Sequence, residues 1–273
     1  MLEQKIAETL NILKRGETSA LALNPTDGYY LAFSGGKDSQ VLYSLAQLSG
    51  VKFKAYYSVT SIDPPQNVYF IREHYPDVKF VRHKENFFKL IQKHGLPTMN
   101  RRYCCERLKE NFGAGNVVLT GVRAEESKRR AAYAAIEIFS RRKEHVGKPR
   151  ERTFEQLEQQ EFQCIKGKDK LMVRPILNWT ETEVWEYIQR YNLPVNPCYA
   201  SVGRVGCMFC PFSNRKRMED YEKRYPGFKR ELMRSLEIYW KKTEEHMLST
   251  PEEYYDWWKS KQSVEKYKAQ KSW

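Results

Sequence analysis

The sequence has no run of apolar residues long enough to cross a bilayer, and it lacks a leader in which a charged start precedes an apolar stretch. These absences favour a cytoplasmic protein without a membrane partner. Cytoplasmic thiols stay reduced, so the 6 cysteines are expected to be ligands or free thiols rather than disulfides. No internal repeat is present.

Acidic residues are also in short supply. The chain of 273 residues holds 34 Asp and Glu against 47 Lys and Arg, which gives a net charge of +13. A basic surface attracts polyanions over long distances. A nucleic acid is therefore an expected partner, although the same charge could serve a small anionic nucleotide and solubility alone.

One short motif predicts a phosphate site. The apolar, aromatic residues 29–33 are typical of a buried strand, and residues 41–46 have the spacing of a helix. Free N–H groups at a helix N-terminus converge on an anion, and glycines let the backbone approach it closely. A lysine adds positive charge and serines add hydroxyl donors. The residues between the strand and the helix are Ser34, Gly35, Gly36, Lys37, Asp38 and Ser39.

Further strands and helices alternate along the chain, which predicts an α/β fold with a doubly wound, mostly parallel sheet covered on both faces. Ligands of such sheets sit beyond the carboxyl ends of the strands. The phosphate loop, Asp63 and the turn at Gly121 and Arg123 should therefore converge on one cleft. The expected strands are residues 29–33, 51–59, 78–81 and 116–120, and the expected helices include residues 1–16 and 67–75.

Three segments are expected along the chain. Residues 1–27 form a helix and a loop at 18–27, residues 28–215 form the nucleotide-binding domain with the cysteines, and residues 216–273 form a helical extension. Residues 127–170 are polar and predict exposed helix and mobile loop. Thr180 and Glu183 have the spacing of a capping box at a helix start. The aromatic residues 254–258 favour a docking helix over a ligand platform.

Four of the cysteines form two pairs, the adjacent Cys104 and Cys105 and the Cys-x-x-Cys pair Cys207 and Cys210. Four thiolates suit zinc or an iron–sulfur cluster. Their spacing alone leaves the metal undecided, and unligated thiols remain an alternative. Cys164 and Cys198 are expected to be small buried apolar residues rather than nucleophiles.

The loop resembles the PP-loop of the superfamily that contains ATP pyrophosphatases and the PAPS and adenylylsulfate reductases. Residues 96–105 and 174–197 are similar to stretches of the same family, so the resemblance spans about residues 29–214. The spacing of the cysteine pairs resembles that of iron–sulfur adenylylsulfate reductases and of the iron–sulfur ATP pyrophosphatases of DNA phosphorothioation. In both groups four such cysteines hold a 4Fe-4S cluster, which the resemblance implies here for Cys104, Cys105, Cys207 and Cys210.

Within this family the reductases attack their substrate with a cysteine in a C-terminal Glu-Cys-Gly-Leu-His motif. No cysteine follows Cys210 in this sequence, which disfavours that activity. The resemblance to the other branch implies cleavage of ATP between its α- and β-phosphates, commonly with Mg²⁺. The acceptor becomes an adenylate, and sulfur then displaces AMP.

Roles for individual residues follow from this resemblance. Lys37 and the loop amides would hold the leaving pyrophosphate, and Asp38 would help hold Mg²⁺ or cap the following helix. Asp63 would contact ribose or adenine, or simply make a turn. Arg123 would bind phosphate at the strand end beside Gly121. Residues 128–150 form either a strip that binds a nucleic-acid backbone or a basic loop without contacts.

The leading hypothesis is an ATP pyrophosphatase that adenylates an acceptor for sulfur transfer to a nucleic acid. The expected partners are an adenine nucleotide, a nucleic acid and a cysteine desulfurase as sulfur donor, with a homodimer as an open alternative. Two other hypotheses are a sulfonucleotide reductase that obtains its thiol elsewhere and a non-catalytic nucleotide-binding module.

Overall fold

The computed structural model describes residues 1–139 and 169–271, and these residues cluster into two compact units. The described parts of Met1–Ser58, Gln66–Val81 and Asn111–Tyr199 make unit 1. Unit 2 consists of Val59–Pro65, Arg82–Glu110 and the chain from Ala200. Each unit has its own core and is described by itself.

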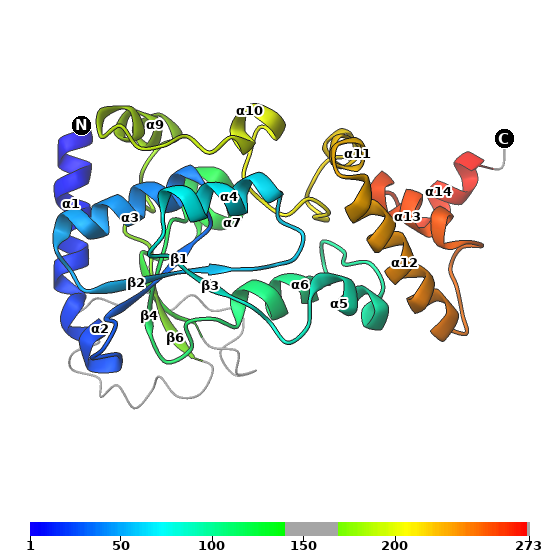
Figure 1. Cartoon of the computed structure of the whole chain (residues 1–273), viewed down its shortest axis with the longest axis horizontal. Helices are drawn as coiled ribbons and strands as arrows, with labels where there is room; N and C mark the ends of the chain where they lie inside the picture. Colours follow the sequence, from blue (N-terminus) through cyan, green and yellow to red (C-terminus); the bar gives the residue numbers. More distant parts are fainter. Residues whose placement is uncertain (140–168, 272–273) are drawn as a thin grey trace. The chain divides into compact units, whose positions relative to one another are not determined.

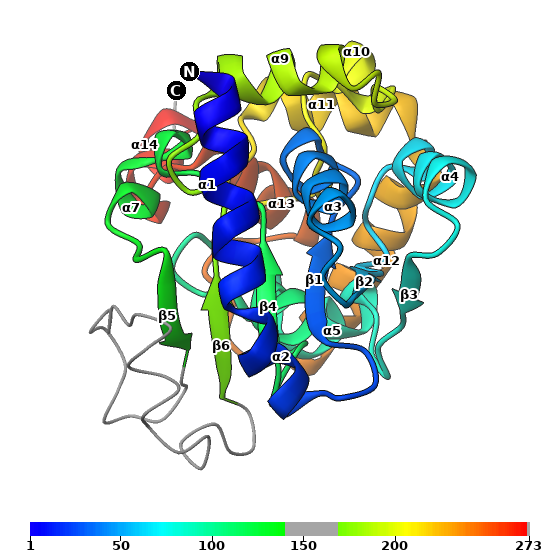
Figure 2. The same cartoon turned by 90° about the vertical axis from the view of Figure 1, so that its left-hand side faces the viewer.

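Unit 1 is built on a six-stranded sheet with the order β3-β2-β1-β4-β6-β5, which Figure 2 shows strand beside strand. All neighbouring strands are parallel except β5, which runs antiparallel to β6. The predicted mostly parallel α/β fold is therefore confirmed. The strands are β1 (Tyr29–Phe33), β2 (Phe53–Ser58), β3 (Lys79–Val81), β4 (Val117–Thr120), β5 (Ile136–Phe139) and β6 (Lys170–Val173).

Apolar side chains hold the strands of this sheet. Tyr29, Leu31 and Phe33 are buried along the central strand β1, and the Tyr29 hydroxyl donates a hydrogen bond to the carbonyl of Leu13. Because β1 and β4 are parallel neighbours, their carboxyl ends lie at the same edge of the sheet. The loops that follow Phe33 and Thr120 are therefore brought together.

Helices flank the sheet (Figure 1), and α1, α3 and α9 pack against one another. Helix α3 buries Val41, Leu42 and Leu45, while α9 begins with the predicted capping box of Thr180 and Glu183. The helices of this unit are α1 (Leu2–Arg15), α2 (Glu17–Leu23), α3 (Lys37–Ser49), α4 (Pro65–His74), the 3₁₀ turn Ala124–Glu126, α7 (Lys128–Ala131) and α9 (Glu181–Arg190).

Two predictions for this unit were wrong in part. Residues 18–27 were expected to be a loop, but Glu17–Leu23 form α2, because Ser19 and Ala20 pack inward and Ala and Leu favour helix. Strand β5 was not expected within residues 127–170, although its Ile-Glu-Ile-Phe sequence alternates. The remainder of that segment, residues 140–168, lies outside the described residues.

Unit 2 is helical around an aromatic core. The predicted docking helix is α13, whose Tyr254, Tyr255 and Trp258 are buried in this core, and α12 packs along α5. The elements are α5 (Phe87–His94), α6 (Tyr103–Cys105), the π-helical turn Glu106–Glu110, α11 (Arg215–Arg224), α12 (Pro226–Lys242), α13 (Pro251–Ser260) and α14 (Val264–Lys271), and α10 (Cys198–Val202) crosses the boundary between the units.

The boundaries of the units differ from the expected segments. We expected residues 28–215 to include the cysteines in one nucleotide-binding domain, but the four paired cysteines lie in unit 2. The reason is packing, because Cys104 and Cys207 lie against the apolar core that the C-terminal helices build. Within the described parts of the chain, none of the helices is long and apolar enough to cross a membrane.

Candidate functional site

The phosphate loop of unit 1 makes a tight turn between β1 and α3. Gly35 has a φ of +75°, and a Cβ atom there would collide with the side-chain oxygen of Asn67. Gly121, after β4, approaches the same turn so closely that a Cβ atom would lie 2.9 Å from the Asp38 carbonyl oxygen. Both positions therefore require glycine. The structure brings together the loop and the Gly121 turn, as expected.

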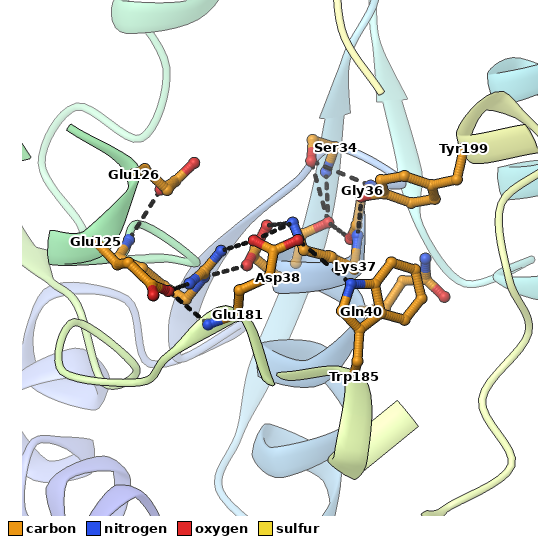
Figure 3. A network of polar contacts seen from close by, with 12 residues as sticks. Ser34, Gly36, Lys37, Asp38, Gln40, Glu125, Glu126, Glu181, Trp185 and Tyr199 are labelled. Atoms are coloured by element: carbon orange, nitrogen blue, oxygen red, sulfur yellow. Dashed lines mark hydrogen bonds and ion pairs between the residues drawn. The ribbon is translucent and has the colours of Figure 1, made fainter. Parts of the chain in front are cut away.

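Hydroxyl groups fix the loop from within. The Ser39 hydroxyl donates to the Gly36 carbonyl at 2.8 Å and accepts from the Ser34 amide at 3.2 Å. The Ser34 hydroxyl in turn accepts from the Gly36 amide at 3.3 Å (Figure 3). The two serines thus hold the turn in shape and pair the amides of Ser34 and Gly36 within the loop.

The amide of Lys37, at the N-terminus of α3, donates to the Tyr199 hydroxyl at 2.8 Å. Helix N-termini favour a negatively charged partner at this place, because unpaired N–H groups and the helix dipole point there. The neutral hydroxyl of Tyr199 therefore holds a position that suits a phosphate oxygen. Burial raises the pKa of Tyr199, so the hydroxyl stays protonated.

Arg123 sits at the centre of an acidic network formed with Asp38, Glu125 and Glu181. Its side chain is only 1% exposed, and its N–H groups donate to Asp38, to Glu125 at 2.8 Å and to Glu181 at 2.7 Å. Lys37 joins through contacts of 3.3 Å to Asp38 and 3.4 Å to Glu181. The guanidinium expected to bind phosphate is thus directed at carboxylates in this state.

These contacts shift the pKa values of the network. Burial acts to raise the pKa of Glu181, but the attraction of Lys37 and Arg123 outweighs it and leaves the pKa below its ordinary value. Burial likewise acts to lower the pKa of Arg123, and the neighbouring carboxylates raise it overall. Both groups therefore stay charged around neutral pH, with three carboxylates facing two cations.

Several residues that position the loop carried no role in the sequence prediction. The Asn196 amide donates to the Gly35 carbonyl at 2.8 Å and to the Asn67 side chain at 2.7 Å. The Gln40 amide also donates to the Gly35 carbonyl, at 3.2 Å. Asn196 is fully buried. In the sequence it stands between Val195 and a proline, and a polar residue between two apolar residues is the signal that could have marked it as a buried hydrogen-bonding group.

Glu181 was also missed as a site residue. It follows the cap residue Thr180 directly, while Glu183 closes the capping box. Glu181 is therefore not needed for the capping box, and at the start of the helix it contacts Arg123 and Lys37 instead. An acidic residue beyond what a capping box needs is a signal that sequence reasoning can use.

Asp63 and the paired cysteines belong to unit 2. The Asp63 carboxylate accepts from the Thr60 hydroxyl at 2.7 Å and from the Thr60 amide at 3.2 Å, and it lies 3.7 Å from the Cys207 sulfur. These contacts are those of a turn residue that adjoins the cysteines. A contact of Asp63 with ribose or adenine stays a prediction.

The cysteine set comprises Cys104, Cys105, Cys207 and Cys210, all partly exposed and free of disulfides. A hydrogen bond from the Cys104 thiol, together with Arg102 and Lys109, lowers the pKa of Cys105. Burial raises the pKa of Cys207 to about 11, against the attraction of Lys109. Cationic groups therefore accompany both pairs, as suits sulfur ligands that become thiolates.

The donor chemistry of this set fits a 4Fe-4S cluster. Across residues 1–139 and 169–271, no three His, Cys, Asp or Glu side chains converge closely enough for a single metal ion. A four-iron cluster sets a different demand, because each thiolate binds a different iron and the sulfurs need not meet at one point. A hydrogen bond with Cys105, burial, and the charges of Cys105, Cys207 and Cys210 raise the pKa of Cys104, as is expected when the two pairs lie within electrostatic reach of each other.

The remaining predictions concern Cys198, Cys164 and the basic strip 128–150. Cys198 is fully buried, as expected of an apolar residue, and its amide donates to Asn196 at 2.9 Å. Cys164 lies outside the described residues. Of the basic strip 128–150, Lys128 and Arg129 are exposed at α7, and residues from 140 onward are not described.

Comparisons with known proteins agree with this picture. Residues 28–213 match the model of the phosphoadenosine phosphosulfate reductase domain, a family named for an enzyme that acts on an adenine nucleotide. Sulfate adenylyltransferase subunit 2 of Myxococcus xanthus is 27% identical over 255 residues, which cover 87% of this chain and 80% of that protein.

Other similarities are more limited. An uncharacterized protein of Methanocaldococcus jannaschii is 26% identical over 72% of the chain, and the chain spans only 38% of that relative and 51% of a second one from the same organism. The crystal structure of the PAPS reductase of Candida auris in complex with phosphate gives a TM-score of 0.45 at 18% identity, covering 74% of this chain and 93% of that one.

The family match begins at the strand before the phosphate loop and ends after the Cys-x-x-Cys pair. It thus includes both the loop with its acidic network and all four paired cysteines. The chain therefore belongs to the phosphoadenosine phosphosulfate reductase domain family.

Proposed function

We propose that this protein cleaves ATP between its α- and β-phosphates and adenylates an acceptor for sulfur transfer to a nucleic acid. The observation that carries the proposal is the N-terminus of α3, where the Lys37 amide donates to the Tyr199 hydroxyl at a position that suits a phosphate oxygen and the Lys37 ammonium lies 5.7 Å from the centre of the Tyr199 ring. An acceptor oxygen attacks the α-phosphorus, and pyrophosphate leaves with the electron pair of the broken P–O bond. A thiol reductant releases the persulfide sulfur of the desulfurase as sulfide and is itself oxidised to a disulfide. The sulfide then attacks the adenylated atom of the acceptor, and AMP leaves with the electron pair of the broken bond.

Positive charge at the loop supports pyrophosphate as the leaving group. Lys37 is only 11% exposed, so its ammonium would act on the phosphates in a partly water-free setting where charge interactions are strong. Its contacts with Asp38 and Glu181 hold it in place before the nucleotide binds. Phosphoryl chemistry depends mainly on such positioning and charge neutralisation.

Carboxylates beside the loop suit Mg²⁺, which prefers oxygen ligands and phosphate oxygens. Asp38 stands at the start of α3 and Glu181 at the start of α9, and both face Lys37. In this role the two carboxylates would hold the ion, which neutralises phosphate charge when bound. Arg123 keeps both side chains oriented.

The similarity to a sulfate adenylyltransferase subunit supports adenylyl transfer as the reaction class, since that name describes attack on ATP by an acceptor oxygen. The acceptor itself is proposed from charge. A net charge of +13 and the exposed residues Lys128 and Arg129 of α7 favour a polyanion over sulfate. A cysteine desulfurase is the proposed source of sulfur.

The test is turnover by anaerobically purified protein. ATP with Mg²⁺ is offered with single-stranded or duplex DNA, and released pyrophosphate is measured. We expect the protein to release pyrophosphate. We expect Lys37→Ala to lower the rate of release about a thousandfold, because a main charge contact of the transition state is lost. Lys14→Ala, which removes an exposed lysine of α1, is the matched control and should keep full activity.

Two other results would reject the proposal. Adenylylsulfate with a thiol reductant is offered separately, and sulfite formation would identify a sulfonucleotide reductase instead. Tight ATP binding without turnover, even with DNA and a desulfurase present, would identify a non-catalytic nucleotide-binding module.

A further inference from the structure

Unit 2 contains a cavity of about 120 Å³ that the proposed function does not use. Its walls come from the segments that adjoin the two cysteine pairs and from the end of α13. Met99 precedes the Cys104–Cys105 pair and Pro211 directly follows Cys210. The aromatic and polar part of the wall consists of Trp257, Trp258, Lys261 and Gln262.

Both indole rings of this wall have their polar atoms satisfied within unit 2. The Trp257 N–H donates to the Gln262 carbonyl at 2.9 Å, and the Trp258 N–H donates to the Pro97 carbonyl. Trp258 is buried and Trp257 is half-buried. The rings therefore offer the cavity apolar surface and no hydrogen-bond donors, which suits a flat apolar partner.

Among the described residues that line the cavity, Gln262 is the one with a buried side-chain polar atom that has no hydrogen-bond partner. Its side-chain oxygen is buried and finds no hydrogen-bond partner among the residues that the structure describes. A buried polar atom without a partner costs free energy in the absence of a ligand. Gln262 lines the cavity, and rotation of its terminal amide would turn the oxygen toward a ligand that donates an N–H to it and so recovers that free energy.

Lys261 supplies positive charge at the same place. It ends α13 with a φ of +61°, and its ammonium donates to the Pro211 carbonyl at 2.7 Å and lies 4.8 Å from the centre of the Trp258 ring. The ammonium thus stands beside both the aromatic wall and the turn of the Cys-x-x-Cys pair. An anionic group attached to the occupant would meet this charge.

We propose that this cavity binds one unpaired base of a single-stranded nucleic acid. A base combines a flat aromatic ring, N–H donors at its edge and a phosphate close by, and these match the indoles, Gln262 and Lys261. An apolar protein side chain would fill the cavity but leave the Gln262 oxygen unpaired. The proposal rests on the nucleic-acid acceptor of the proposed function and adds that the acceptor is bound single-stranded, beside the cysteine set.

Binding can be tested without ATP. A fluorescent single strand of about 12 nucleotides and the same sequence as duplex are titrated into the full-length protein, with fluorescence anisotropy and tryptophan quenching as readouts. We expect the single strand to bind at least about tenfold more tightly than the duplex and to quench tryptophan, because a base that stacks on indole requires an unpaired strand.

Gln262→Leu is the decisive variant, because it removes the amide and keeps an apolar side chain of similar size. We expect it to weaken single-strand binding about tenfold while the melting temperature stays equal or rises, since an unpaired buried oxygen is removed. Lys261→Gln should weaken binding and reduce the slope of log affinity against log salt by about one. Lys241→Gln removes an exposed lysine of α12 as the matched control and should leave the affinity within about twofold.

Several outcomes would overturn the proposal. Equal affinity for single strand and duplex would show general electrostatic binding, as would full affinity in Gln262→Leu. A parallel loss of affinity and melting temperature in that variant would make Gln262 structural only. Quenching by an apolar peptide but by no oligonucleotide would assign the cavity to a protein partner. Pyrophosphate release from ATP is measured on the same preparation, so failure of the proposed function is seen separately.

Discussion

In unit 1 the phosphate loop is one continuous segment between β1 and α3, whereas in unit 2 the cysteine set comes from two segments far apart in the chain. The loop of unit 1 is held by a parallel sheet whose strand ends point to one edge. The cysteines of unit 2 stand on short elements, the three-residue helix α6 and the turn before α11, which pack on an aromatic core.

Because of this difference, we expect protein contacts to fix the geometry of the phosphate loop and a bound ligand to help fix the geometry of the cysteine set. The loop of unit 1 is fixed by hydrogen bonds from Ser39, Asn67 and Asn196, so its geometry exists without a ligand. The cysteine set is held by the packing of Cys104 and Cys207 on the aromatic core and by contacts of Cys207 with Thr60 and Asp63, and we expect a bound cluster to supply part of its order. Metal binding and folding are coupled in sites of this kind.

The largest expected effect is on unit 2. Cys207→Ser should lower the iron bound by anaerobically purified protein at least about tenfold and make residues of unit 2 more susceptible to proteolysis, because a thiolate ligand is lost. Nucleotide binding by unit 1 should persist. Iron analysis, visible absorbance and limited proteolysis with and without ATP check the prediction.

Cys198→Ala is the control for this variant, because Cys198 belongs to unit 1 and lies outside the cysteine set. It should keep the iron content of the wild type. Full iron content in Cys207→Ser would contradict the assignment of the ligands, and stoichiometric zinc in the wild type would contradict the cluster itself.

The second prediction concerns the buried Arg123. Arg123→Met removes the cation that three carboxylates share, so Asp38, Glu125 and Glu181 repel one another without compensation. We expect unit 1 to lose about 3 kcal/mol of stability, in the range found when one partner of a buried ion pair is removed. Arg129→Met, an exposed arginine of α7, should change stability by less than about 0.5 kcal/mol.

Urea denaturation at neutral pH measures both variants. A loss for Arg123→Met no larger than that for Arg129→Met would show that the network contributes orientation but no net stability. The iron content of unit 2 should be the same in both variants, so that any change in stability can be assigned to unit 1.

The sheet and the loop were predictable because their signals are local. A strand, a glycine turn and a helix start follow one another at residues 29–46, and the carboxyl ends of parallel strands explain why the Gly121 turn arrives beside Asp38. The environment of Arg123 was not predictable. Its three carboxylates come from positions 38, 125 and 181, and no local pattern links them.

That Asp63 belongs to unit 2 could not be predicted for the same reason. Its position after β2 suggested the edge of the sheet, but Thr60 and Cys207 bind its carboxylate. The π-helical turn Glu106–Glu110 and the packing of α5 on α12 likewise depend on contacts between distant segments. Long-range packing therefore decides what sequence periodicity alone cannot.

The third prediction concerns Glu222, a largely buried carboxylate of unit 2 whose side chain is 10% exposed. Glu222 accepts from the Tyr255 hydroxyl at 2.8 Å, Lys229 at 2.8 Å and Lys259 at 3.0 Å. Burial acts to raise its pKa, but these donors outweigh it and leave the pKa below its ordinary value. A depressed pKa contributes stability above the unfolded value, and this contribution is lost as the pH falls through the folded value.

Unit 2 should therefore lose stability below about pH 4, where an unfolded glutamate takes up its proton. Glu222→Gln should cost about 2 kcal/mol at pH 7 and flatten that acid dependence, because the charge is gone. Glu219→Gln, which breaks an exposed pair with Arg215, is the control and should leave the stability nearly unchanged at both pH values, because solvent screens that pair. Denaturation curves at pH 7 and pH 3.5 check both. An unchanged acid slope in Glu222→Gln would contradict the prediction.

The smallest expected effect tests whether the Tyr199 hydroxyl holds the place of a phosphate oxygen. Tyr199→Phe removes the acceptor of the Lys37 amide, so the ligand-free protein should lose about 1 kcal/mol. ATP would supply its own oxygen to that amide, so the loss should shrink when ATP is bound. Melting temperatures with and without ATP measure the difference.

Tyr187→Phe is the matched control, because it removes a hydroxyl that is bonded to Ser44 at 3.0 Å, away from the loop. Its loss of stability should be the same with and without ATP. If Tyr199→Phe behaves like this control, the hydroxyl is a permanent part of the loop and the phosphate must bind elsewhere on α3. If ATP restores the stability, the loop of unit 1 is built to exchange the Tyr199 oxygen for a phosphate oxygen.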